Sequence, residues 1–182
     1  DQAGVRRSFG IVFQDPSLDD ELSAYENMQL HGVLYGLSAA SVKARVDEML
    51  AFVDLADRRD DLVKTFSGGM KRRLEIARAL LHHPKILFLD EPTVGLDPQT
   101  RNHIWDYIQR LNRKEGITVL LTTHYMDEAE KTAKRVAIID HGKILVEGSP
   151  TQLKTRTRTR SLEAAFIKLT GHGIRNEGAS GT

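Results

Sequence analysis

The chain has 182 residues, of which 40% are hydrophobic and 28% are charged, and its net charge is +1 at pH 7. This composition is ordinary for a globular chain of about one domain, and the near-neutral charge argues against a dedicated nucleic-acid surface. The sequence contains no cysteine, which excludes disulfides and thiolate chemistry, and no apolar run approaches the ~20 residues that span a bilayer.

The first half of the chain is dominated by helical patterns. Residues 8–13 are expected to form a short buried strand that stops at the turn signal of Gln14, Asp15 and Pro16. Apolar residues at helical spacing then predict three helices, over residues 23–37, 38–53 and 67–80. The apolar positions of the first helix are Met28, Leu30, Val33, Leu34 and Leu37. A charged, irregular segment is expected at 57–65.

After Pro84 the pattern changes to strands that alternate with helices. Short apolar runs predict four strands, at residues 86–89, 117–121, 136–139 and 144–146. Helices are expected from Asp97 to about Leu111 and over residues 127–133. This alternation implies an α/β domain with a largely parallel sheet. The continuous apolar run Ile86–Leu89 is expected to be a strand that is covered on both faces.

Two consecutive glycines open the helix that begins near residue 67. Glycines at a helix start let backbone N–H groups approach a phosphate, and the helix dipole favours the negative charge. Beside Gly68 and Gly69, the hydroxyl of Ser67 can donate to the same anion. Taken alone, Ser-Gly-Gly is more often a plain helix cap, so the phosphate interpretation depends on the motifs that follow.

Two adjacent carboxylates, Asp90 and Glu91, follow the apolar run at 86–89. A divalent cation that bridges phosphates needs carboxylate ligands, and a carboxylate can also act as a general base. An isolated Asp-Glu pair is more often an acidic cap, but the buried strand before it favours the functional interpretation. His124 follows the next strand and two threonines, although a lone histidine is usually structural.

The order of these motifs resembles the ATP-binding cassette family. The segment Ser67-Gly68-Gly69-Met70-Lys71 looks like the signature motif, and the strand ending in Asp90-Glu91 looks like a Walker B strand. Gly95-Leu96-Asp97 resembles the D-loop, and Thr122-Thr123-His124 resembles the region of the switch histidine. The resemblance extends from Val5 to about Thr170.

The resemblance implies roles in ATP hydrolysis for four residues. Asp90 is the matching residue for Mg²⁺, and Glu91 matches the general base that polarises the water attacking the γ-phosphate. His124 matches the switch histidine, which contacts the γ-phosphate and orients that water. Gln14, just after the first strand, resembles the Q-loop glutamine, which senses Mg²⁺ and joins the core to a helical arm.

The resemblance also implies that ATP is bound between two subunits. The signature residues Ser67, Gly68, Gly69 and Met70 would face the γ-phosphate of ATP held by the other subunit of a homodimer. Met70 stands where the most common family pattern has glutamine, and drug-exporter-type members often share this feature. Asp97 matches the D-loop aspartate that crosses the dimer interface, and it is also suited to cap the next helix.

One motif of the family does not occur in the sequence. The phosphate loop, Gly-x-x-x-x-Gly-Lys-Ser/Thr, is absent, and the one Gly-Lys pair, Gly142-Lys143, is followed by Ile144. The chain also opens with Asp1 rather than methionine. We therefore expect the C-terminal part of a nucleotide-binding subunit that has lost its N-terminus, and we expect this chain alone to be inactive.

The expected fold is α/β, a partial P-loop NTPase (RecA-like) core with a parallel sheet and an inserted helical subdomain. The core is assigned to residues 1–14 and 85–150, and the helical subdomain to residues 15–84. A C-terminal extension is expected over residues 151–182, and it is expected to end in a disordered tail from Gly171.

Within the family, the motifs look most like those of ATPase subunits of multidrug or antibiotic exporters. The resemblance implies a peripheral ATPase on the cytoplasmic face of the membrane that uses ATP and Mg²⁺ and drives a separate transmembrane permease. The helical arm is expected to dock on that permease through Leu18, Leu22 and Tyr25. No nucleic-acid partner is expected, and the arginine-rich run at 156–160 is interpreted as a solvated linker.

Two alternatives stay open at this point. One is a soluble cassette ATPase that acts on ribosomes or DNA, although this sequence has neither a second cassette nor a long coiled coil. The other is a fragment without catalytic activity, because the backbone nest and the lysine of a phosphate loop are missing.

Overall fold

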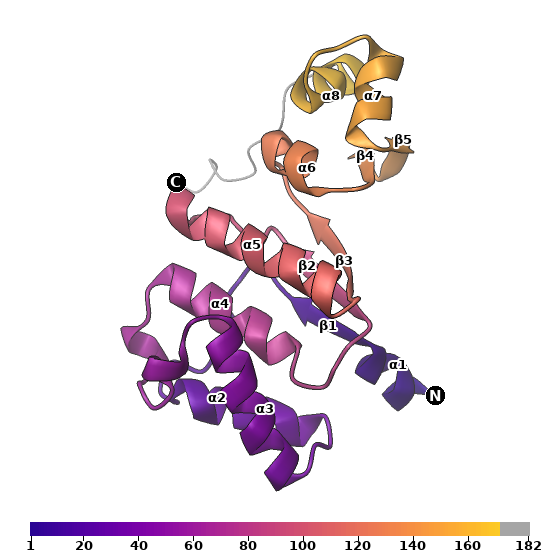
Figure 1. Ribbon diagram of the computed structural model, residues 1–182. Helices are drawn as coiled ribbons and strands as arrows, with labels where there is room; N and C mark the ends of the chain where they lie inside the picture. Colours follow the sequence, from indigo (N-terminus) through magenta and orange to yellow (C-terminus); the bar gives the residue numbers. More distant parts are fainter. Residues whose placement is uncertain (172–182) are drawn as a thin grey trace. The chain divides into compact units, whose positions relative to one another are not determined.

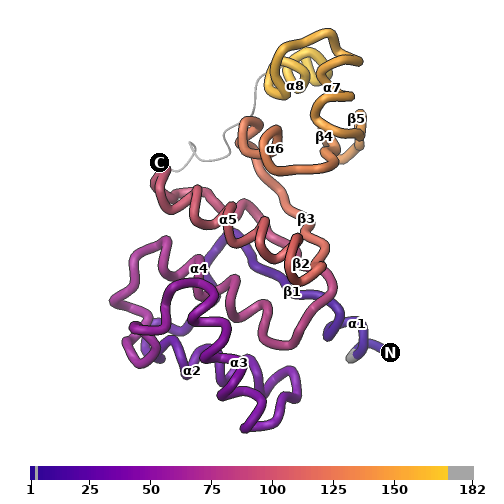
Figure 2. Tube along the Cα trace, viewed as in Figure 1, coloured from indigo at the N-terminus to yellow at the C-terminus, as the bar shows by residue number. Residues whose placement is uncertain are grey.

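The change from helical to alternating patterns near Pro84 is reproduced in the structure, a computed structural model that describes residues 1–171. Contacts divide the chain into two units, Asp1–Thr122 and the residues from Thr123 onward. The helices and strands of each unit are labelled in Figure 1, and Figure 2 traces the same chain as a tube.

The first unit contains the predicted elements and three short helices that the sequence pattern did not predict. Its elements are α1 (Gln2–Ser8), β1 (Phe9–Val12), α2 (Ala24–Leu34), α3 (Ala39–Phe52), η1 (Ala56–Arg58), η2 (Val63–Thr65), α4 (Gly68–Ala79), β2 (Ile86–Asp90), α5 (Pro98–Lys114) and β3 (Thr118–Thr122). Side-chain caps explain where the three predicted helices begin, because Ser23, Ser38 and Ser67 each accept a hydrogen bond from the N–H three residues later.

The predicted parallel sheet is confirmed in the first unit. Its strands run in the order β1-β2-β3, and both neighbouring pairs are parallel. The register places Asp90 of β2 opposite Thr122 of β3, so both side chains lie at the C-terminal edge of the sheet. This edge is where an open α/β sheet binds ligands.

One face of this sheet carries the core of the unit. Leu87 and Leu89 of β2 are no more than 1% exposed, and they belong to the same hydrophobic cluster as the buried residues of α4 and α5. The opposite face is more open, because Ile11 is 39% and Leu120 is 55% exposed and Phe88 is only half-buried. The prediction that β2 is covered on both faces is therefore wrong for the described chain. The physical reason is that successive side chains of a strand point to opposite faces, and the helices of this cluster pack on the face that carries Leu87 and Leu89.

The C-terminal half of α4 approaches β1 very closely, and Gly10 allows this approach. A Cβ atom at position 10 would lie 2.4 Å from the carbonyl oxygen of Ala79. Because that oxygen belongs to the backbone, any side chain at position 10 would push α4 away from the sheet. The sequence gives no local signal for this contact, since the two residues are far apart in the chain.

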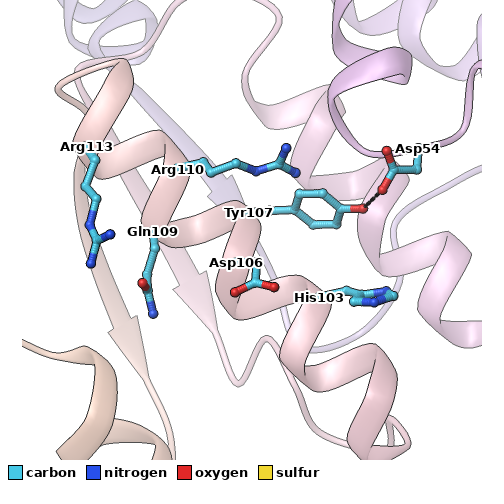
Figure 3. Close-up of a pocket in the computed structure, with 7 residues that line it drawn as sticks. All are labelled: Asp54, His103, Asp106, Tyr107, Gln109, Arg110 and Arg113. Atoms are coloured by element: carbon cyan, nitrogen blue, oxygen red, sulfur yellow. Dashed lines mark hydrogen bonds between the residues drawn. The ribbon is translucent and has the colours of Figure 1, made fainter.

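The C-terminal end of α3 is tied to two other helices. Asp54 has a left-handed φ of 55°, and its N–H bonds to Ala51 while the N–H of Leu55 bonds to Leu50. This is the Schellman pattern of a helix end, with aspartate at the position that glycine usually occupies. The hydroxyl of Tyr107 in α5 donates to the Asp54 carboxylate, as Figure 3 shows.

Two arginines complete this helix end. Arg73 of α4 donates to the carbonyl of Val53 at 3.0 Å, and Arg110 of α5 donates to the carbonyl of Phe52 at 3.3 Å. The Arg110 guanidinium also lies over the rings of Phe52 and Tyr107, at 4.8 and 4.7 Å. Cations near the last turn also interact favourably with the helix dipole. These contacts hold α3, α4 and α5 together as one group.

The apolar face of α2 is not the one that the spacing indicated. Met28 is fully buried, but Leu30, Val33 and Leu34 are 53%, 60% and 74% exposed. The buried positions of the helix are instead Ala24, Asn27, Met28 and Gly32. The Asn27 side chain can be buried at low cost, because it donates to the Asp19 and Ser23 carbonyls and accepts the Asp19 N–H. The structure therefore leaves a row of three apolar side chains on the surface.

The second unit contains α6 (Met126–Thr132), β4 (Val136–Asp140), β5 (Lys143–Gly148), α7 (Pro150–Thr157) and α8 (Leu162–Thr170). The predicted strands β4 and β5 form an antiparallel pair of their own. A separate small cluster of buried side chains fills the unit: Ala129, Ile138, Val146, Leu153 and Leu162. The Glu130 carboxylate joins three helices, because it accepts from Lys154 and from the N–H of Leu162.

The arginine-rich run at 156–160 is not simply a linker, so that prediction is wrong in part. Arg156 and Thr157 form the last turn of α7, and Arg158 caps this helix in a left-handed conformation. Thr157 is buried, at 7% exposure, and its hydroxyl is satisfied by donating to the Leu153 carbonyl within the helix. The side chains of the three arginines are exposed, as expected for solvated charges.

The expected disordered tail lies, apart from Gly171, outside the described residues. Gly171 itself ends α8 with a φ of 74°. Among the helices that the structure describes, none is both long enough and apolar enough to cross a membrane.

Candidate functional site

The signature loop, Ser67–Met70, forms the N-terminus of α4. The Ser67 hydroxyl oxygen accepts a hydrogen bond from the N–H of Met70 at 3.3 Å, and Ser67 and Gly68 are exposed. A helix N-terminus leaves backbone N–H groups without partners inside the helix, and the dipole makes this end positive. The predicted anion-binding geometry and the plain cap therefore coexist at the same residues.

Asp97 caps α5 in the same way that Ser67 caps α4. One carboxylate oxygen accepts the N–H groups of Gln99 and Thr100, each at 3.0 Å, and the other accepts the Thr100 hydroxyl at 2.6 Å. The hydrogen bond from the Thr100 hydroxyl is the main reason that the pKa of Asp97 is lowered from its usual value. Asp97 therefore stays ionised at the start of the helix, where negative charge is favoured.

The two adjacent carboxylates lie at the C-terminal end of β2, and Thr122 of β3 joins them. The Thr122 hydroxyl donates to the Asp90 carboxylate at 2.5 Å and accepts the backbone N–H of Glu91 at 3.1 Å. Glu91 has a left-handed φ of 46°, which is uncommon for a residue other than glycine. No role for Thr122 was predicted from the sequence, and the signal that could have found it is its position at the end of the neighbouring strand.

A single carboxylate and a hydroxyl suit the way in which Mg²⁺ is usually held at phosphates. This ion keeps several waters and needs only one or two protein carboxylates when phosphates supply the rest. Among the described residues, no group of three or more acidic or histidine side chains has the geometry of a complete metal site. Asp90 with Thr122 thus fits a magnesium ion that arrives with a nucleotide, and does not form a cage of its own.

Gln14 lies on an exposed loop whose backbone is held by α4. Arg72 donates to the carbonyl of Phe13 at 2.6 Å and to the carbonyl of Gln14 at 2.9 Å. Glu75, one turn later, accepts the N–H of Ser17 at 2.8 Å. Neither Arg72 nor Glu75 was predicted to hold this loop, because no local pattern in the sequence connects them with it.

Arg72 and Glu75 form an ion pair that is nearly removed from water. Their side chains are 7% and 2% exposed, and the charged atoms are 3.3 Å apart. Burial raises the pKa of the Glu75 carboxyl and lowers the pKa of Arg72, while each partner's charge acts in the opposite direction. The pair is retained because the loop carbonyls and the Ser17 N–H supply the hydrogen bonds that burial would otherwise remove.

His124 lies in the second unit, two residues after β3. Its ring packs against that of Tyr125 with centroids 4.2 Å apart, and the N–H of Tyr125 bonds to the Thr123 hydroxyl at 3.0 Å. These local contacts form a turn between β3 and α6. The structure thus brings Asp90, Glu91 and Thr122 together in the first unit. His124 belongs to the second unit, where its ring contacts Tyr125.

Two hollows open on the first unit, and neither is lined by the predicted site residues. One, of about 440 Å³, lies beside α5 and is lined by charged side chains around Tyr107 and Asp54 (Figure 3). The other, of about 190 Å³, is lined by aromatic and charged residues of β1, α2 and α4, including His31, Tyr35 and Arg78. Burial lowers the pKa of His31 to about 4, and the charge of Arg78 adds to this effect.

Comparison with known proteins identifies the relatives of this chain. The sequence profile of the ABC transporter family matches residues 1–94. The linearmycin resistance ATP-binding protein LnrL of Bacillus subtilis is 44% identical over 172 residues, which are 94% of this chain and 54% of that protein. The daunorubicin/doxorubicin resistance ATP-binding protein DrrA of Streptomyces peucetius is 47% identical over 151 residues, which are 83% of this chain and 46% of that protein.

Solved structures match the fold as well. An ATP-binding subunit of an ABC transporter superposes with a TM-score of 0.77 at 28% identity, covering 92% of this chain and 70% of its own. The protein cbiO1 of Clostridium perfringens, part of the transporter complex cbiONQ, gives 0.76 at 32% identity, covering 84% and 61%. The ATP-binding cassette MJ0796, a dimer bound to ADP and Pi, gives 0.71 at 30% identity, covering 81% and 65%.

The chain has an α/β fold of the P-loop NTPase type, as predicted. This class follows from the parallel sheet with carboxylates at its C-terminal edge and from the similarity to these solved structures. The chain belongs to the ABC transporter family, which confirms the resemblance noted from the motifs. It spans about half the length of the curated relatives it matches.

The buried ion pair gives a direct test of how the loop at Gln14 is held. We expect Arg72→Ala to lower the free energy of unfolding by about 3 kcal/mol or more, because it leaves the Glu75 carboxylate buried without its partner. The measurement is urea denaturation of the chain. Lys71→Ala is the matched control, since Lys71 pairs with a largely exposed Asp20 and should cost no more than about 1 kcal/mol. Equal effects of the two substitutions would contradict this account.

Proposed function

We propose that the intact protein is the ATP-hydrolysing subunit of an ABC exporter that drives a separate transmembrane permease. The observation that carries the proposal is the arrangement at the end of β2, where Thr122 contacts both Asp90 and the backbone of Glu91. Relatives named for drug resistance support the exporter type. Drugs or antibiotics are therefore the substrate class that we assign to the exporter.

The proposed site residues have different roles in the chemistry. Asp90 would hold Mg²⁺ together with Gln14, and this ion would offset charge on the transferring phosphate. Glu91 is proposed as the general base for the attacking water, and His124 as the residue that contacts the γ-phosphate. The Thr122 hydroxyl donates to Asp90 and accepts from Glu91, so it orders the backbone that carries both carboxylates.

The signature loop is proposed to bind ATP that is held by a second copy of the subunit. The positive end of α4 suits the γ-phosphate, and Ser67, Gly68, Gly69 and Met70 are the residues assigned to it. Asp97 would cross the same interface from the start of α5. A dimer of the related cassette MJ0796, bound to ADP and Pi, supports this sandwich arrangement.

We also propose the domain assignment that the sequence indicated. Residues 1–14 and 85–150 would form the ATPase core, 15–84 the helical arm and 151–182 the C-terminal extension. The subunit would work at the cytoplasmic face of the membrane and without a nucleic-acid partner. The membership of cbiO1 in a transporter complex supports a permease partner.

The missing phosphate-loop motif leads to a prediction about the 182-residue chain alone. Each charge-assisted hydrogen bond to a phosphate contributes about 1.5–3 kcal/mol, so losing several should weaken ATP binding by orders of magnitude. We expect titration calorimetry with Mg-ATP to detect no binding at micromolar concentrations, and we expect no hydrolysis. The control is a longer gene product that includes such a loop, which should bind. Micromolar affinity of the 182-residue chain would refute the prediction.

The assignment of Glu91 is tested in the gene product that contains a phosphate loop. We expect Glu91→Gln to lower the ATPase rate by at least about 100-fold, because general-base catalysis is lost while the side chain keeps its size. ATP should then stay bound, and size-exclusion chromatography should detect an ATP-dependent dimer. His124→Ala should resemble this variant, whereas Asp90→Asn should weaken Mg²⁺-dependent binding. Glu115→Gln, at the exposed end of α5, is the control and should hydrolyse ATP normally.

The structure changes the residues that we propose for docking on the permease. Leu18 and Tyr25 pack against the main hydrophobic core, and Leu22 is half-buried, so these side chains support the fold of the arm. The apolar row of Leu30, Val33 and Leu34 is exposed instead, and it lies on the helix whose His31 and Tyr35 line the smaller hollow. An exposed apolar row beside a hollow with aromatic walls suits an amphipathic helix of the permease.

Negative charges on the apolar row of α2 should abolish binding to the permease without affecting ATP hydrolysis. We expect the triple variant Leu30→Glu, Val33→Glu and Leu34→Glu to lose co-purification with the permease, because burying new carboxylates in the contact is costly. Made in the gene product that contains a phosphate loop, the variant should keep a basal ATPase rate and a melting temperature close to the wild-type values. Gln29→Glu, also exposed on α2, is the control. Retention of the permease by the triple variant would show that docking occurs on another surface.

A further inference from the structure

The two glycines of the signature loop differ in what surrounds them. A Cβ atom at position 69 would lie 2.5 Å from Cγ2 of Thr100 and 3.3 Å from its Oγ1. A Cβ atom at position 68 would meet nothing closer than Cδ2 of Leu96, at 4.0 Å. The close approach of Thr100 therefore requires glycine at position 69, whereas position 68 has room for a methyl group.

The methyl group of Thr100 has little freedom to move away. The hydroxyl on the same Cβ donates to the Asp97 carboxylate at 2.6 Å, and the Thr100 N–H donates to the other carboxylate oxygen at 3.0 Å. A β-branched side chain on a helix has few accessible χ1 rotamers, and a different rotamer would break the hydroxyl bond. The bond to Asp97 thus fixes the direction of the methyl group that faces Gly69.

We propose that Thr100 is a positioning residue that locks the signature loop to the D-loop: its methyl group packs on Gly69 while its hydroxyl holds the carboxylate of Asp97. The proposal rests on the proposed function in one respect, the assignment of both loops to ATP bound between two subunits. With this lock, the N-termini of α4 and α5 move as one body. The position of the signature loop at the phosphate then depends on the position of the D-loop at the dimer interface.

A second connection between α4 and α5 supports this proposal. Both helices bond to Asp54 at the end of α3, because Arg73 of α4 donates to its carbonyl and Tyr107 of α5 donates to its carboxylate. Figure 3 shows the bond from Tyr107. The hydrogen bond from the Thr100 hydroxyl is also the largest cause of the lowered pKa of Asp97. That pKa therefore gives a solution readout of the Thr100 side of the lock.

A size exchange tests the packing contact in the 182-residue chain. We expect Gly69→Ala to lower the melting temperature by at least about 3 °C, because the new methyl group overlaps that of Thr100. Adding Thr100→Ser should restore most of the loss, since serine keeps the hydroxyl and removes the methyl group. Gly68→Ala is the matched control and should not lower the melting temperature, because alanine favours the helix and has room.

A second variant tests the hydrogen bond separately. Thr100→Val keeps a methyl group toward Gly69 but removes the hydroxyl, so carbon-detected NMR titration should find the pKa of Asp97 shifted up toward its ordinary value. Thr100→Ser should leave this pKa nearly unchanged. An unchanged pKa in Thr100→Val would overturn the lock, as would a Gly69→Ala variant that is as stable as Gly68→Ala.

The positioning role itself is tested on ATP hydrolysis in the gene product that contains a phosphate loop. We expect Gly69→Ala to lower kcat at least tenfold and Thr100→Ser to restore it in the double variant. Restored stability without restored kcat would overturn the positioning role and leave only a structural contact. The melting-temperature and NMR measurements need no ATP, so they test the contact between Thr100, Gly69 and Asp97 even if the proposed function is wrong.

Discussion

The buried pair of Arg72 and Glu75 is the contact on which the arrangement of the functional loops in the first unit depends. Two charged groups with almost no exposure are costly to desolvate, and their mutual attraction alone would not offset that cost. The offset comes from the loop after β1, whose carbonyls and N–H group bond to the pair. Loop and helix therefore stabilise each other, and the backbone of Gln14 follows any movement of α4.

Helix α4 makes such contacts along its whole length. Its first turn packs on Thr100 of α5, its second holds the loop at Gln14, and Arg73 caps the end of α3. Near its C-terminus, the Ala79 carbonyl lies against Gly10 of β1 at a distance that excludes a side chain. Because each contact involves backbone atoms or stiff side chains, a shift of the signature loop cannot be absorbed locally.

The features that the sequence predicted are those whose signals are local. Ser67 and Asp97 start helices because their side chains reach N–H groups two or three residues away, and the apolar run before Asp90 forms the strand that it indicates. The features that it missed join residues far apart in the chain. Spacing alone finds an apolar stripe such as Leu30, Val33 and Leu34, but only tertiary packing decides whether that stripe is covered. The roles of Thr122 and Arg72 likewise required the neighbouring strand and loop to be in place.

Two acidic residues of this unit, Asp54 and Glu91, have a left-handed backbone conformation. A left-handed residue other than glycine costs about 1 kcal/mol or more, so it persists only where other contacts determine it. At Asp54 the carboxylate itself compensates, because it accepts the Tyr107 hydroxyl and helps to fix the end of α3. At Glu91 the backbone makes two hydrogen bonds: its N–H donates to the Thr122 hydroxyl, and its carbonyl accepts the N–H of Val94. These two bonds help to hold the left-handed backbone of Glu91 next to Asp90 at the edge of the sheet.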